Sequence, residues 1–508
     1  MPKAGLVGSI ALLAATVTGC GVLTTSTHAQ DRVPSEPTMI NYVDPARVHG
    51  LNVRTITEGD AADRHVQAAY PAIDDAPRLT EKLRKTVLGR LDHFNRVASA
   101  DSDLPHREFN VDWQLAAVSD QVIGVRLRMG ESAGAGWSES RTTVWYDRTD
   151  ARVLDSAGLL KNGTALKDLA LLVKTGLAGR RPEVNSSVIK AEAGFFDSMG
   201  FNSHGDLVVE FDDQQVGAAS LGRVVVAVPA AEIERLLSAT GMRAQRAAVK
   251  TADEPGSAVW KDFVAKADTA KPPAESSQTG SVDCAKAKCV ALTYDDGPGP
   301  GTERLLDVLG RYRARATFFT VGANASAKPE LLKRMMREGH LVGNHTWSHR
   351  DLTALTDSKV VDQLSRAQYV ITQTIGQVPG LMRPPYGESD GRIAAIARTL
   401  GLSVVGWSVD AGDRHGGKTK DIADRAVAGA KPGAVILMHD MDDPTIKAAP
   451  EILRRLQEKG YTFVTVPELY GSHPMRPGET YDSGASGRSS SSEKPPGGPT
   501  ALERTPTP

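Results

Sequence analysis

The sequence predicts an α/β fold for residues 282–470, in which short apolar strands alternate with amphipathic helices. The expected strands are Val290–Tyr294, Thr317–Val321, Leu341–Gly343, Leu381–Arg383, Val404–Trp407, Val435–Leu437 and Phe463–Val466. Helical periodicity lies between them, near residues 303–312, 329–338, 360–375, 392–400, 422–428 and 449–459. Repeated βα units favour a parallel sheet, open or closed as a barrel, with a functional site at the carboxyl ends of its strands.

Length and composition bound the rest of the chain. With 508 residues, 40% of them hydrophobic, the chain is long enough for two or three domains with cores of their own. The formal net charge of −1 gives no electrostatic argument for binding nucleic acid, an anionic membrane surface or an acidic substrate.

Residues 1–19 have the features of a secretory signal: Lys3, an apolar run over residues 6–17 and a small-residue exit. The segment Val17–Cys20 resembles the bacterial lipoprotein box, which implies that Cys20 is lipidated and anchors the protein outside the cytoplasmic membrane. Cleavage after Ala29, which would discard Cys20, is the alternative. The polar residues 20–38 are expected to be a tether.

Residues 39–242 predict a smaller α+β accessory domain. A helix is expected near residues 79–94, and strands at Val122–Arg128, Thr142–Tyr146, Leu207–Phe211 and Val224–Val228. Trp113, Trp137 and Trp145 are interpreted as core or edge residues rather than a sugar platform. The Ala/Pro/Ser-rich residues 243–281 predict a linker, and the Gly/Ser/Pro-rich residues 471–508 predict a disordered tail.

The second half of the accessory domain, residues 150–242, resembles the extracytoplasmic domain of lysozyme-sensing anti-sigma factors. The resemblance lies in Gly205–Phe211, Val224–Val228, Pro229 and the helix expected at residues 231–237. It implies that the domain could take a protein ligand, which the sequence does not identify. A generic α+β spacer is the alternative.

Cysteine content fits an oxidising compartment. Once Cys20 is assigned to lipidation, Cys284 and Cys289 remain as an even pair close enough to form a disulfide. Two unlinked thiols are the alternative.

The first candidate site residues are two adjacent carboxylates, Asp295 and Asp296, at the end of an apolar strand that breaks into Gly297–Pro298. His345 and His349, four residues apart, would face the same way on a helical turn and could chelate one ion. With a carboxylate they supply two nitrogen ligands and one oxygen ligand and leave a fourth position open, as in catalytic zinc sites. The same ligands also suit cobalt or nickel.

Further polar segments follow three later strands: Arg383–Gly387, Trp407–Asp413 and Leu437–Asp440. With these motifs in order, residues 290–470 resemble the NodB-type polysaccharide deacetylases of carbohydrate esterase family 4. The resemblance implies a distorted (β/α) barrel. It also implies that Asp296, His345 and His349 bind a divalent metal.

The resemblance assigns roles to the remaining motif residues. It implies that Asp295 is the general base, oriented by Arg383. It makes the backbone N–H of Tyr386 an oxyanion donor and Leu437 a lining residue for the acetyl methyl. His439 would protonate the leaving amine, and Asp413 would hold His439 in the right tautomer and raise its pKa.

One position departs from the family pattern, because Arg414 follows Asp413 where the family has Trp. We expect this charge to widen or polarise the acetate pocket, and we interpret Trp407 as a core residue rather than a substitute. His340 is interpreted as a structural histidine, and Asp440, Asp442 and Asp443 as a solvated turn.

Together these observations predict an extracytoplasmic, lipid-anchored, zinc-dependent N-deacetylase acting on peptidoglycan N-acetylglucosamine. Other substrates left open are N-acetylmuramic acid residues, chitin oligomers and O-acetylated polysaccharides. A different class of function is a surface glycan- or protein-binding module with a degenerate barrel. Acetate release with and without chelator distinguishes the enzyme from the module.

Overall fold

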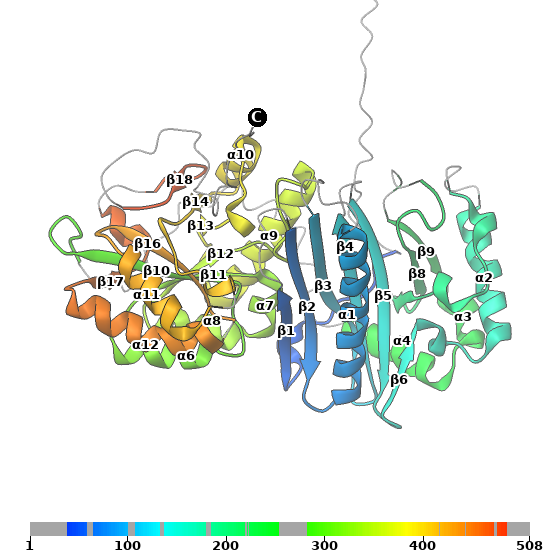
Figure 1. The fold of residues 1–508 in the computed structure, drawn as a ribbon. Helices are drawn as coiled ribbons and strands as arrows, with labels where there is room; N and C mark the ends of the chain where they lie inside the picture. Colours follow the sequence, from blue (N-terminus) through cyan, green and yellow to red (C-terminus); the bar gives the residue numbers. More distant parts are fainter. Residues whose placement is uncertain are drawn as a thin grey trace, which may run out of the picture.

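The computed structural model describes residues 38–57, 64–99, 107–132, 137–178, 184–218, 221, 223–252, 282–415, 417–441, 443–471 and 475–484 (Figure 1). The predicted signal peptide, Cys20, the tether before residue 38, most of the linker and the end of the tail lie outside these residues. Among the described helices, none combines the length and the apolar character needed to cross a bilayer.

The amino-terminal sheet has six strands in the order β1-β2-β3-β4-β5-β6. Their bounds are Leu51–Thr57, Arg64–Ile73, Arg107–Val118, Val122–Ser132, Trp137–Asp147 and Arg152–Asp155. Only the β2–β3 pair is parallel. Helix α1 (Pro77–Ser99) lies along the sheet, and its Leu79 and Leu83 share one core with Val66 and Phe109 (Figure 1).

A second packed unit follows in the chain, built on the antiparallel sheet β7-β8-β9 (Ser198–Phe201, Leu207–Phe211, Val224–Val228). Helices α2 (Gly163–Leu177), α3 (Ala230–Ile233) and α4 (Ala239–Ala252) accompany it. The predicted boundary at residue 242 therefore falls inside α4. Ala244 and Ala248, one helical turn apart, are buried in the core of this unit, so the folded region continues ten residues beyond the predicted boundary.

The carboxy-terminal region is a curled sheet in the order β15-β16-β10-β11-β12-β13-β14-β18, with β17 also paired to β10. The strands are β10 Cys289–Asp295, β11 Thr317–Thr320, β12 Leu341–Asn344, β13 Leu381–Met382, β14 Ser403–Val405, β15 Val409–Asp410, β16 Ala434–His439, β17 Thr462–Val464 and β18 Thr480–Tyr481. Every pair is parallel. Only three residues separate β14 from β15, so this bent segment joins the two sides of the sheet and the predicted distorted (β/α) barrel is confirmed.

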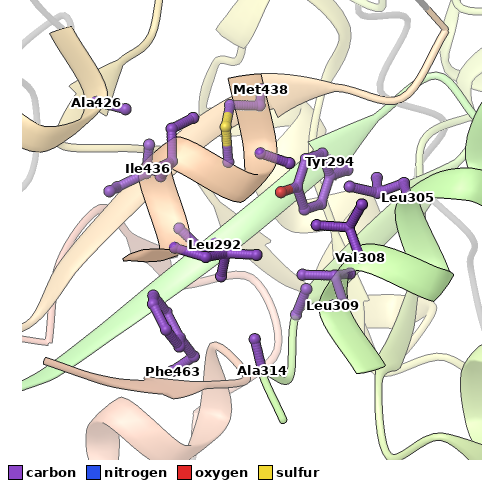
Figure 2. Packing of buried hydrophobic residues seen from close by; sticks show 14 of the residues in the cluster. Leu292, Tyr294, Leu305, Val308, Leu309, Ala314, Ala426, Ile436, Met438 and Phe463 are labelled. Atoms are coloured by element: carbon purple, nitrogen blue, oxygen red, sulfur yellow. The ribbon is translucent and has the colours of Figure 1, made fainter. Parts of the chain in front are cut away.

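The barrel helices are α6 Thr302–Arg311, α7 Gly322–Ala327, α8 Pro329–Arg337, α9 Asp357–Ile375, α10 Gly391–Thr399, α11 Thr419–Gly429 and α12 Asp443–Glu458. Alternate residues of β10 face opposite ways: Leu292 and Tyr294 pack against Leu305 and Leu309 of α6 (Figure 2). Ala291 belongs instead to the inner core of the barrel. This alternation determines which way the last residue of the strand, Asp295, points.

Three smaller predictions can be compared with the structure. Cys284 and Cys289 form the predicted disulfide, with a 2.02 Å bond between their sulfurs. His340 is buried and accepts a hydrogen bond from the backbone N–H of Ala316, in agreement with a structural role. The tail predicted from residue 471 contains β18, which pairs with β14, so the fold extends to at least Tyr481.

Candidate active site

The candidate site lies at the carboxyl ends of the barrel strands. Asp295 ends β10 and, by strand alternation, points to the barrel interior. Asp296, the next residue, has a left-handed backbone with φ of 75°. Asp tolerates this conformation better than most residues, and the turn brings both carboxylates to the same cavity.

The segment that carries His345 and His349 follows β12 and is a loop, so the predicted helical turn is wrong. Thr346 and His349 have left-handed φ angles of 65° and 57°. The loop is held by buried side chains: Asn344 accepts from the N–H of Thr346 at 2.8 Å, and Gln363 accepts from the next two amides. The two imidazoles therefore converge through this hydrogen-bonded loop rather than through helical spacing.

Asp296, His345 and His349 form a buried group whose ligand atoms all lie within 4.8 Å of one another. Asp296 Oδ1 is 3.4 Å from Nε2 of His345 and 3.2 Å from Nε2 of His349, yet it accepts no hydrogen bond from a described group. His345 Nδ1 lies 2.7 Å from the carbonyl oxygen of Arg383, which fixes that nitrogen as the protonated one and leaves Nε2 with its lone pair. Three electron-pair donors directed at one point fit a divalent cation.

The protonation states agree with metal binding. Burial holds the pKa of His349 well below its usual range, so the imidazole stays neutral as a ligand must. Burial alone would raise the pKa of Asp296, but the charge of Arg414 beside it holds that pKa well below the usual range. Neutral His349 and ionised Asp296 are the forms that can bind a metal.

Asp295 is paired with Arg383, whose side chain is fully buried. Arg383 Nη1 donates to Asp295 Oδ1 and to Thr293 Oγ1, both at 2.8 Å. Its other nitrogens donate to the carbonyl oxygens of Val405 and Gly406. The guanidinium is fixed by four acceptors, so it holds the Asp295 carboxylate in one orientation.

His439, at the end of β16, lines the same cavity as the metal-ligand candidates and is held by Asp413. Asp413 Oδ1 is 2.9 Å from His439 Nδ1, and Oδ2 accepts from the backbone N–H of His439 and from Thr445 Oγ1. Burial would lower the pKa of His439, but the Asp413 carboxylate raises it above its usual value. Nε2 of this histidine is thus the nitrogen left for a substrate.

Asp295, His345, His349 and His439 line one open cavity, together with the predicted residues Tyr386 and Leu437. Tyr386 lies in a short turn, Pro385–Gly387, and has a left-handed φ of 61°. Trp407 packs against the inner core of the barrel, as its interpretation as a core residue requires, but it is half-buried and also lines the cavity. The bend between β14 and β15 turns its indole toward the cavity.

Arg414 reaches into the same cavity and donates to Oδ2 of Asp296. The position of its guanidinium agrees with the expectation that this residue polarises the pocket. Its contact with Asp296, a metal-ligand candidate, is not predictable from the sequence motif. Asp440 is also unlike its prediction: it is buried and accepts a hydrogen bond from Thr302, because the chain after β16 turns under Gly297 rather than into solvent. Thr293 and Thr445 were missed, since a threonine in a strand or helix carries no motif of its own.

Comparison with known proteins agrees with this geometry. A family model described as polysaccharide deacetylase matches residues 283–405. The peptidoglycan-N-acetylglucosamine deacetylase PgdA of Listeria monocytogenes is 39% identical over 185 residues, which is 36% of this chain and 39% of that protein. A peptidoglycan-N-acetylglucosamine deacetylase of Bacillus cereus is 35% identical over 37% of this chain and 70% of its own length.

A third relative matches more of the chain. The peptidoglycan-N-acetylmuramic acid deacetylase PdaC of Bacillus subtilis is 30% identical over 383 residues, covering 71% of this chain and 75% of that protein. A match of this length extends beyond the barrel into the amino-terminal region. From the ordered motifs, the barrel and these similarities, the chain belongs to the polysaccharide deacetylase family.

Proposed function

We propose that this protein is a metal-dependent hydrolase that removes N-acetyl groups from peptidoglycan, with N-acetylglucosamine residues as the first substrate. The observation that carries the proposal is the convergence of Asp296, His345 and His349 around one point, with Asp295 and His439 lining the same cavity. Bound zinc, or cobalt in its place, would supply Lewis-acid polarisation of the acetamide carbonyl and of the attacking water.

Asp295 serves as the general base in this proposal. Its carboxylate takes the proton of the water as oxygen attacks the acetyl carbon. Arg383 orients the carboxylate, since Nη1 donates to Oδ1 at 2.8 Å. The backbone N–H of Tyr386 donates to the oxyanion that forms on the former carbonyl oxygen, and Leu437 packs against the acetyl methyl.

His439 completes the reaction as the general acid. An amide nitrogen leaves poorly unless it is protonated, so Nε2 of His439 delivers a proton to it as the C–N bond breaks. Asp413 supports this step because its carboxylate, 2.9 Å from Nδ1, raises the pKa of His439. The products are acetate and a free amino sugar.

The proposed location is the outer face of a bacterial cytoplasmic membrane, with Cys20 as the lipid anchor. The signal-like residues 1–19 support export, and the disulfide between Cys284 and Cys289 suits an oxidising compartment. An anchored enzyme with a tether would meet the peptidoglycan layer directly, which supports a cell-wall substrate over a soluble chitin oligomer.

N-Acetylmuramic acid residues are the second candidate substrate. The relative named for that activity matches 71% of this chain, so its match extends into the amino-terminal region. The sugar that is modified is therefore open between the two alternating residues of the peptidoglycan strand.

One experiment tests the reaction and separates the two sugars. The chain that follows signal residues 1–19 is incubated with peptidoglycan, with chitin oligomers and with acetylated xylan, each with added Zn²⁺ or with chelator. We expect metal-dependent acetate release from peptidoglycan and free amino groups on glucosamine residues after digestion. Free amino groups on muramic acid alone would select the second candidate. Binding of glycan with no acetate release from any polymer would contradict the enzyme assignment.

A further inference from the structure

One face of the amino-terminal sheet is packed against the active-site loops of the barrel. Strand alternation places Val66 and Phe109 on the α1 side of this sheet. The neighbouring residues of the same strands, His65 on β2 and Glu108 and Asn110 on β3, point to the other face and are also buried.

Two of these three buried residues, His65 and Glu108, belong to one row across the sheet. His65 pairs with Glu108 between β2 and β3, and Glu108 pairs with Ser132 between β3 and β4. Ser132 pairs in turn with Trp137 of β5. We call His65, Glu108, Trp137 and the nearby Asn110 the contact row.

Asn110 holds the loop that carries the two histidines. Its Nδ2 donates to the carbonyl oxygen of Ser348 at 2.9 Å and lies 3.5 Å from the carbonyl oxygen of His349. Both contacts are buried, and each joins residues more than 230 positions apart in the sequence. The backbone of a metal-ligand candidate is thus bound by a side chain from outside the barrel.

Glu108 and Trp137 hold the residues that follow the second histidine. Glu108 Oε1 accepts from Arg350 Nε at 3.0 Å and from the backbone N–H of Asp351 at 3.3 Å. The guanidinium carbon of Arg350 lies 3.3 Å from the centre of a Trp137 ring. These contacts fix the exit of the loop as Asn110 fixes its centre.

His65 contacts the other side of the cavity. Its ring stacks on the ring of Tyr386 with 3.7 Å between centroids and an interplanar angle of 16°. The Tyr386 ring also contacts the His349 ring edge-to-face, with 4.7 Å between centroids and an interplanar angle of 80°. The Tyr386 ring is therefore in contact with His65 and with a metal-ligand candidate at once.

The two residues held in this way have strained backbones. His349 and Tyr386 have left-handed φ angles of 57° and 61°, which non-glycine residues keep only when their surroundings impose them. Here part of those surroundings is the contact row. Because a small misplacement of a reacting group can slow a reaction strongly, these contacts bear on catalysis and not only on docking of the sheet.

We propose that the amino-terminal sheet is a working part of the active site: Asn110 positions His349, and His65 positions Tyr386. Both are positioning residues, since they act on the reaction through another residue. The kinetic part of this inference rests on the proposed function, whereas its metal-binding part does not.

The metal-binding part is tested with Asn110→Ala in the full chain, using Zn²⁺ titration calorimetry. Losing a partner of a ligand residue typically weakens metal binding by about 10- to 100-fold, and we expect a loss of roughly tenfold here. Gln114→Ala is the matched control, because Gln114 lies on the same strand and donates to the carbonyl oxygen of Asn41 at 3.1 Å, within the amino-terminal part. Equal Zn²⁺ affinity of a folded Asn110→Ala protein and wild type would overturn the assignment of Asn110.

The kinetic part is tested with His65→Ala and His65→Phe. We expect His65→Ala to lower kcat by about tenfold with KM within about twofold, because the oxyanion donor is loosened while the glycan contacts remain. Phe keeps the stacked ring, so His65→Phe should recover kcat to within about threefold of wild type. His93→Ala, an exposed histidine on α1, serves as the control.

Three outcomes separate this inference from its alternatives. A lower thermal midpoint with unchanged kcat in His65→Ala would show a purely structural contact and overturn it. A His65→Phe protein with a kcat as low as that of His65→Ala would show that ring stacking is not how His65 positions Tyr386. If wild type releases no acetate at all, the proposed function fails, and the Zn²⁺ affinity of Asn110→Ala still decides whether the sheet positions the metal ligands.

Discussion

Arg414 donates to Oδ2 of Asp296, while Oδ1 of the same carboxylate faces the Nε2 atoms of His345 and His349. One oxygen of the carboxylate thus binds the Arg414 guanidinium, and the other faces the predicted metal position. It can offer one oxygen to the metal without losing its other contact. The guanidinium also places a positive charge beside a site built for a divalent ion.

Arg414→Gln is therefore expected to tighten Zn²⁺ binding. Removing the charge leaves Asp296 unneutralised, and at the separations in this cavity an uncompensated charge is worth at least ~1.4 kcal/mol, or about tenfold in affinity. Calorimetric titration of the metal-free protein with Zn²⁺ measures this change in affinity. Arg334→Gln removes the same charge from α8, where Arg334 pairs with Asp307 and Glu338, and should leave the affinity unchanged. Weaker binding in Arg414→Gln would mean that the residue serves mainly to orient Asp296.

Asp413→Asn is expected to move the alkaline limb of the pH–rate profile to lower pH. His439 must be protonated to act as an acid, so the rate falls as pH rises through its pKa. Burial lowers that pKa and the Asp413 charge raises it, with a net rise above 6.5 in the wild type. Removing the Asp413 charge removes the largest contribution that raises this pKa, so the limb shifts to lower pH. The measurement is kcat/KM for acetate release between about pH 5 and 9.

Asp443→Asn provides the control for this shift. Asp443 is an exposed residue at the start of α12. Its ion pairs are with Arg304 and Lys447 and do not involve His439. Its profile should coincide with that of wild type. An unchanged alkaline limb in Asp413→Asn would assign the limb to a group other than His439.

Tyr294→Phe is expected to stabilise the barrel. The Tyr294 ring packs against α6, and its hydroxyl oxygen is buried without a hydrogen-bond partner among the described residues (Figure 2). Removing a buried, unpaired hydroxyl should raise the free energy of unfolding by about 1 kcal/mol. Denaturant unfolding measures the change, and acetate release should not change because the ring faces away from the cavity.

Tyr461→Phe is the matched control for Tyr294→Phe. The Tyr461 hydroxyl donates to the carbonyl oxygen of Ala430 at 2.9 Å, so its removal should cost about 1 kcal/mol. Opposite signs for the two substitutions are the expected pattern. A loss of stability in Tyr294→Phe would reveal a partner for its hydroxyl.

The motifs that the sequence identified share one property, which is that each lies at or just after the end of a parallel strand. Asp295 and His439 end β10 and β16, and His345 directly follows β12, and the carboxyl ends of parallel strands meet at one edge. The order of the motifs therefore predicted which side chains meet. Their local conformations were not predictable in the same way: the loop from His345 to His349 depends on Gln363, fourteen residues further along the chain.

The face of the amino-terminal sheet shows the limit of pattern analysis most clearly. Glu108, Asn110 and Asp112 alternate with Phe109 and Val111 on β3, a pattern typical of a strand with one solvated face. All three polar residues are instead buried. For Glu108 and Asn110 the covering residues lie some 240 positions later in the chain, and no local pattern encodes a partner at that distance.

The separation of metal binding from proton transfer is tested most directly by measuring Zn²⁺ content and acetate release together in Asp295→Asn and His345→Ala. We expect Asp295→Asn to retain about one Zn²⁺ per chain while losing at least ~100-fold in kcat, because a general base contributes about that much. His345→Ala should lose both the metal and the activity. A metal-free Asp295→Asn protein, or a His345→Ala protein that still releases acetate at the wild-type rate, would contradict the assignment of these two residues.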